Sequence, residues 1–154
     1  TMADRSAINA PIRTNRFEVE LELPGGPVPG WRRVDLPGQE TKVTRYREGP
    51  DPEYEFPLAG GTTEGADLVM ERGAKQGEKM LWDWREKARQ GKLDETRKTI
   101  AVVVYDSTGN QSLLRFEFQK AWPRSYSPPT LDAQAGNTAT EELTIAYDRM
   151  KRTM

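Results

Sequence analysis

Alternation of apolar and polar residues constrains this chain more than any other feature of its sequence. It recurs in Arg16 to Leu23, in Gln111 to Lys120 and in Glu141 to Arg149. A period of two residues is typical of a β-strand with one buried face. A fourth segment, Arg97 to Asp106, has apolar residues on both faces, which predicts a strand covered on both sides. The chain is therefore predicted to be built around β-strands.

Three further segments are predicted to be strands, and one segment to be a helix. The strands are Trp31 to Leu36, Thr41 to Glu48 and Asp67 to Glu71, the last turned by Arg72-Gly73. From about Gly77 to Gln90 the apolar residues follow a helical period, and Gly91 is placed to end the helix. With six or seven strands and no βαβ alternation, we predict a mainly β fold: an antiparallel sandwich or barrel with one flanking α-helix.

The remaining segments are predicted to be connections. Residues 1–14 form an N-terminal arm, and residues 15–154 form a single domain. The proline-rich stretch from Gly49 to Gly61 is expected to be a long loop. Trp122-Pro123 is expected to end the strand that precedes it.

Composition argues against several classes of function. The chain has no cysteine and no histidine, which removes disulfides, thiolate nucleophiles, imidazole catalysis and the commonest zinc ligands. We therefore expect no catalytic residues, no cofactor and no metal. The 23 basic and 24 acidic residues leave a net charge of -1, so stable nucleic-acid binding is not expected. The sequence has no apolar run long enough for a membrane anchor and no signal peptide at its start, so synthesis in the cytoplasm is expected.

Four short motifs occur in a characteristic order. They are Tyr46-Arg47-Glu48-Gly49, Glu71-Arg72-Gly73, Leu81-Trp82-Asp83-Trp84 and Ala121-Trp122-Pro123. In their order and spacing, from about Asn15 to Tyr147, the chain resembles the tail-tube proteins of contractile phages and related contractile injection systems. The resemblance implies a structural protomer of an inner tube, in which stacked hexameric rings close their inner sheets into one continuous barrel.

The resemblance also implies the partners. They are further copies of the chain in stacked homohexameric rings, a sheath protein, baseplate and tube-terminating proteins, and transient cargo or DNA in the lumen. The low apolar fraction of 35% agrees with a protein that completes its burial against neighbours. The assembled location would be an injection particle or a phage tail.

Three groups of residues are candidates for assembly. The residues expected to face a polar, nearly charge-balanced lumen are Lys42, Thr44, Asp67, Val69 and Glu71. Those expected in a loop that reaches the next ring are Tyr54, Glu55 and Phe56. Trp82 and Asp83 are expected to contact another subunit or the sheath.

Several alternatives remain open from the sequence. Trp82 lies away from the apolar stripe of its helix, so its ring either covers a sheet edge or forms a subunit contact. The whole chain could instead be a monomeric β-sandwich module that binds protein or glycan through its tryptophans and proline-rich loops. The sequence does not separate phage tubes from bacterial injection systems, or a main-tube subunit from a ring near the baseplate.

Overall fold

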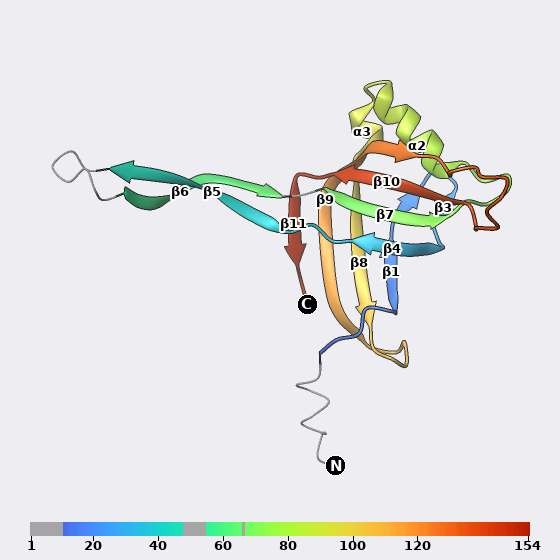
Figure 1. The fold of residues 1–154 in the computed structure, drawn as a ribbon, viewed down its shortest axis with the longest axis horizontal. Coiled ribbons are helices and arrows are strands. Elements are labelled where there is room, and N and C mark those ends of the chain that lie inside the picture. The colour runs from blue at the N-terminus through green and yellow to red at the C-terminus, as the bar shows by residue number, and fades with distance from the viewer. Residues whose placement is uncertain (1–10, 48–54, 66) are drawn as a thin grey trace, which may run out of the picture.

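Seven antiparallel strands form the main sheet of the computed structural model, which describes residues 11–47, 55–65 and 67–154 (Figure 1). Their order is β1-β8-β9-β10-β7-β4, and β11 lies beside β9. The strands are β1 (Phe17–Glu20), β4 (Trp31–Asp35), β7 (Leu68–Gly73), β8 (Lys98–Tyr105), β9 (Ser112–Ser127), β10 (Thr140–Ala146) and β11 (Arg149–Arg152). The prediction of a mainly β, antiparallel chain with a flanking helix is confirmed.

The long strand β9 belongs to two parts of the sheet that run in crossing directions (Figure 1). Its first part pairs with β8 and β11, and residues 122–127 pair with β10. We call β4, β7, β10 and residues 122–127 of β9 the four-stranded layer, and the other strands the second layer. A mainly apolar core fills the space between the two layers, as in an orthogonal β-sandwich.

Two irregularities in β9 mark the corner between the layers. One extra residue lies between the partners of Lys98 and Ile100, and another between the partners of Thr144 and Ile145. Lys120 at the first bulge has a φ of 52°. Bulges bend a strand and increase its twist, and they tolerate proline. Trp122-Pro123 therefore turns the strand at the corner, and the expectation that it ends the strand is wrong.

The core is formed by both layers and by the helix. Its fully or nearly fully buried residues are Leu21, Leu23, Val28, Leu68, Met70, Leu81, Trp84, Ile100, Val102, Phe118, Ala121, Leu143 and Ile145. The helix α2 (Met80–Arg89) contributes Leu81 and Trp84, and the short helix α3 (Leu93–Thr96) follows it. The indole Nε1 of Trp84 donates a 2.7 Å hydrogen bond to the carbonyl of Thr96, which joins the two helices. Gly91 connects them with a φ of 81°, a value that favours glycine.

Several predicted boundaries are wrong. The last predicted strand is split into β10 and β11, and the Asp148 amide between them donates to the carbonyl of Gln119. Strand β7 continues through Arg72-Gly73, because Arg72 pairs with Trp31 and Glu141 on the neighbouring strands. The first predicted strand stops after β1, and β2 (Glu22–Leu23) and β3 (Gly26–Pro27) form a separate small hairpin.

The proline-rich region contains strand where a loop was expected. β5 (Gln39–Arg47) and β6 (Glu55–Gly65) pair with each other in a two-stranded sheet, so the second half of the expected loop is a strand. Their cross-strand pairing extends as far as Arg47 with Glu55. This hairpin projects away from the rest of the molecule along its long axis (Figure 1).

Candidate assembly surfaces

The four-stranded layer has one face toward the core and one polar face toward the outside. Buried and more exposed residues alternate along β7 and β10, as a half-buried sheet requires. On the polar face, Arg33 lies 3.3 Å from a carboxylate oxygen of Glu142, 3.4 Å from Asp35 and 3.7 Å from Glu71. A second ion pair there joins Arg124 and Asp67. Charges of both signs therefore cover this face.

The predicted lumen residues divide between two elements. Val69 and Glu71 are partly exposed and alternate with the buried Leu68 and Met70, which places them on the polar face of the layer. Asp67, just before β7, reaches the same face through Arg124. Lys42 and Thr44 lie in β5, so the fold does not bring them into the same sheet.

Both edges of the four-stranded layer are free in the described parts of the chain. β4 pairs only with β7, and residues 122–127 of β9 pair only with β10. In Figure 1, α2 lies beside the β9 edge, and β4 lies at the opposite edge. An unpaired strand edge presents main-chain donors and acceptors to another strand. The layer can therefore be extended at either side.

A buried polar network, which sequence reasoning missed, crosses the core side of this layer. The side chain of Arg72 has no exposed surface; its Nε donates to Glu141 at 2.8 Å and its Nη1 to Glu78 at 2.7 Å. Its guanidinium carbon also lies 5.9 Å from the ring centroid of Trp31. Every second residue of β7 is buried, so Arg72 follows Leu68 and Met70 on the buried face. This alternation was the sequence signal that could have predicted the burial of Arg72.

The network continues to the β9 edge. The hydroxyl of Tyr126 donates a 2.7 Å hydrogen bond to the second carboxylate oxygen of Glu141. The pKa of Tyr126 is raised to about 12, mainly by burial and then by the hydrogen bond to Glu141 and the negative charge of Glu141. The ring of Tyr126 meets that of Trp82 edge-on, with 5.5 Å between the centroids. Contacts thus run from Trp31 at one free edge to Trp82 at the other.

Trp82 and Asp83 lie on the exposed side of α2. Trp82 keeps 47% of its surface exposed although its ring contacts Tyr126. The ring therefore covers the edge strand, which is one of the two alternatives from the sequence. The exposed fraction also leaves room for a contact with another molecule, so the second alternative stays a prediction.

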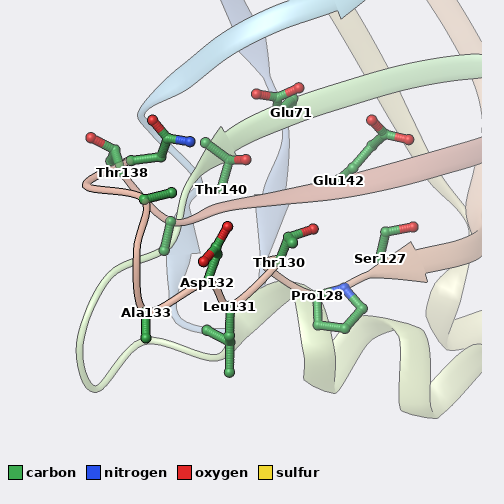
Figure 2. A pocket seen from close by; sticks show the side chains of 13 residues that line it. Glu71, Ser127, Pro128, Thr130, Leu131, Asp132, Ala133, Thr138, Thr140 and Glu142 are labelled. Carbon is green, nitrogen blue, oxygen red and sulfur yellow. The ribbon is translucent and has the colours of Figure 1, made fainter.

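An open cavity with a volume of about 840 Å³ lies at one end of the four-stranded layer, under the loop between β9 and β10 (Figure 2). Glu71, Thr140 and Glu142 line the sheet side, and Leu131 and Asp132 line the loop side. Leu131 is 90% exposed. The β5–β6 hairpin projects from the opposite end of the molecule (Figure 1). Glu55 and Phe56 begin β6, whereas Tyr54 lies outside the described residues.

Across the described ranges, no group of three or more His, Cys, Asp or Glu side chains is arranged to hold a metal ion. No helix in those ranges has the length and apolar character needed to span a bilayer.

Comparison with known proteins gives one family and several similar folds. The model of the family described as T4-like virus tail tube protein gp19 matches residues 13–151. A chain of an extracellular contractile injection system, the PVC sheath–tube complex in the extended state, has a TM-score of 0.80 and 23% identity, covering 99% of this chain and 98% of that chain. Curated protein sequences gave no match.

Two further cryo-EM structures contain similar folds. A chain of the baseplate of the anti-feeding prophage (AFP) has a TM-score of 0.77 and 18% identity, and the match covers 93% of this chain and 95% of that chain. A chain of the PVC sheath/tube terminator has a TM-score of 0.75 and 21% identity, covering 94% and 97%. The comparisons do not support the monomeric binding module.

Proposed function

The chain belongs to the T4-like virus tail tube protein family, gp19, and from this premise we propose that it builds the inner tube of a contractile injection machine. Six copies close into a ring, and the rings stack into a hollow conduit. The observation that carries the proposal is the four-stranded layer, which has one face toward the core, one polar face and, in the described part of the chain, two free edges.

The number of strands in the layer makes ring closure straightforward. Neighbouring strands in the layer are antiparallel, so β4 and the end of β9 run in opposite directions. When rotation places β4 of one copy beside β9 of the next, the new pair is also antiparallel. The ring then becomes one uniform antiparallel barrel with no free edges, which removes the aggregation hazard of exposed strands.

The polar face of the layer lines the lumen of this barrel. Barrels of about 16 to 18 strands already leave an aqueous channel, and six copies of a four-stranded layer enclose a wider one. Asp67, Val69 and Glu71 are then lumen residues, among charges of both signs. Such a wall lets cargo or DNA pass without a strong attraction to either sign of charge.

Stacking uses the two ends of the protomer. The β5–β6 hairpin extends from one end, and the cavity beneath the β9–β10 loop, with its exposed Leu131, lies at the other (Figures 1 and 2). We place the hairpin of one ring against the cavity end of the next ring. Leu131 is an exposed apolar side chain available to this contact.

The outer partners are a sheath, a baseplate and a tube terminator. Support comes from the similar folds, which belong to a sheath–tube complex, a baseplate and a sheath/tube terminator. The protomer is made in the cytoplasm and joins an injection particle or phage tail, and its lumen holds cargo only transiently.

Negative-stain electron microscopy of the purified protein, paired with sedimentation over a range of concentrations and salt, tests ring formation. Hollow rings or tubes with six-fold symmetry are expected, and sedimentation should show large species growing with concentration. A compact monomer at every concentration would contradict the proposal.

A further inference from the structure

Trp82 and Asp83 of α2 form an exposed pair beside one free edge of the four-stranded layer. The Trp82 ring rests against Tyr126 of β9 and is 47% exposed. Asp83 is exposed, and its carboxylate has no ion pair among the described residues. An indole and an unpaired carboxylate together suit a cation, because the ring face and the carboxylate both attract positive charge.

Arg32 lies at the other free edge and has no ion pair with any residue in the described ranges. It lies at the bulge of β4, between Trp31 and Arg33. In the strand register, Trp31 is opposite Arg72 and Arg33 is opposite Glu71. Arg32 is exposed and has no carboxylate partner in the described ranges, whereas its neighbour Arg33 has three. The bulge therefore holds a guanidinium at the edge that is free to pair.

We propose that Arg32 of one copy binds Trp82 and Asp83 of the next copy and fastens the seam of the ring. The proposal rests on the ring proposed above. In such a ring every seam joins the β9 side of one copy to the β4 side of its neighbour, so each copy supplies both halves of the contact. The guanidinium stacks on the indole and pairs with the carboxylate, and the neighbouring strands exclude water from part of the contact.

The buried network fixes the position of this contact. Arg72, Glu141 and Tyr126 connect Trp31, beside Arg32, with Trp82 across the layer. Trp31 is held further by a 2.9 Å hydrogen bond from its Nε1 to the carbonyl of Val28. Both halves of the seam contact are thus supported by the same row of side chains, which lowers the conformational entropy lost when the seam forms.

Charge reversal tests the pairing. Arg32→Asp places two acidic side chains at each seam, and Asp83→Arg places two basic ones there. Each single variant should raise the protein concentration needed for assembly by at least about tenfold, because like charges then face each other. The double variant restores opposite charges and should assemble near the wild-type concentration. Circular dichroism checks that each protomer is folded.

A mixture of the two single variants gives a sharper result. In an alternating ring of the two variants, every seam joins opposite charges, and six is an even number. An equimolar mixture should therefore assemble near the wild-type concentration, at which neither variant assembles alone. As matched controls, Asp94→Arg and Arg97→Asp make the same charge changes near α3, and both should assemble as the wild type does.

The outcomes separate this inference from the proposed ring. If the wild type forms rings and the single reversals assemble equally well, the seam contact is wrong and the ring stands. If the wild type forms no rings, both are wrong. Because the chain has no cysteine, an Arg32→Cys/Asp83→Cys variant gives a second readout: a short bismaleimide should join it into a ladder that ends at the ring size. Intact rings without a ladder would also overturn the contact.

Discussion

Arg72 keeps a charge inside the protomer, where an unpaired ion is costly. Glu141 is 6% exposed, and Glu78 completes the pair of carboxylates around the guanidinium. One nitrogen, Nη2, has no hydrogen-bond partner in the described structure. Burying an ion pair costs solvation, so such a pair is weak evidence of stability, but removing one partner leaves the other charge uncompensated.

Replacing Arg72 with Met should therefore destabilise the protomer strongly. The expected loss is about 3–5 kcal/mol in the free energy of unfolding, because Glu141 and Glu78 lose their cation. Arg33 is the matched control: it lies on the polar face with 53% of its side chain exposed and also contacts carboxylates. Arg33→Met should cost no more than about 1 kcal/mol. Urea unfolding of the dispersed protomer measures both, and equal losses would contradict the role of burial.

Lys120 holds the backbone at the first bulge of β9. Its φ of 52° is in the left-handed region, where a β-branched residue is strongly disfavoured. Lys120→Val should lower the free energy of unfolding by about 1–2 kcal/mol, while Lys120→Gly should change it by less than about 1 kcal/mol. Lys151→Val is the control, because Lys151 in β11 has an ordinary backbone conformation. Thermal unfolding measures the loss of stability in each variant. Equal losses in Lys120→Val and Lys151→Val would argue against backbone strain at Lys120.

At the scale of elements, the sequence predicted the types of element better than their ends. The alternation of apolar and polar residues around Phe116 and Leu143 can be read directly from the sequence, since the polarity of each residue indicates which face of the strand it occupies. The continuation of β9 through Trp122-Pro123 is harder to predict, because two bulges and the pairing with β10 decide it. Proline is a reliable stop only in a regular central strand, and here it lies at a corner.

In the β5–β6 hairpin, β5 agrees with the predicted strand Thr41 to Glu48, whereas β6 escaped prediction. The two strands pair with each other and lie outside the main sheet, so β6 lacks the alternation that a core imposes. Glycine and proline within β6 also indicated a loop. The short, local pairing of this hairpin suggests that the rest of the protomer can fold without it.

Shortening the hairpin tests its role in stacking. Thr41 pairs with Thr63, so residues 42–62 can be replaced by Asn-Gly, a two-residue turn that suits a hairpin. The melting temperature should change little, and rings should form without growing into tubes. Circular dichroism and electron microscopy measure the two effects. A Phe56→Ala variant keeps the hairpin and tests one side chain. Tubes of normal length from the shortened protein would contradict the stacking role.

At the scale of the whole molecule, the family and its mechanical role were predictable from four short motifs, and the contacts between copies were not. The motif residues Arg72 and Trp82 belong to one network in the fold, which joins them through Glu141 and Tyr126, two residues distant from both in the sequence. Val69 and Glu71 share one face of β7, because alternation along a strand determines a shared face. Lys42 and Thr44 lie in β5, which pairs outside the main sheet. That any of these residues faces a lumen stays a prediction.

The lumen assignment is best tested at Val69. Reversing the charge of Asp67 or Glu71 would also break its ion pair with Arg124 or Arg33. A change in DNA retention could then come from altered assembly rather than from the charge of the lumen. Val69 lies on the polar face between Asp35 and Thr144 and carries no charge. Val69→Lys adds one positive charge per copy and forms a basic ring in each layer of the tube.

Tubes of the Val69→Lys variant should retain a short single-stranded DNA that wild-type tubes release, because the basic rings attract phosphate within the channel. Co-sedimentation of a fluorescent oligonucleotide with the tubes measures retention, and added salt should weaken it steeply. Val69→Gln controls for the change of size and polarity. Thr99→Lys adds the same charge on β8, outside the four-stranded layer, and should retain little. Equal retention by the Val69→Lys and Thr99→Lys tubes would mean that Val69 does not face the lumen.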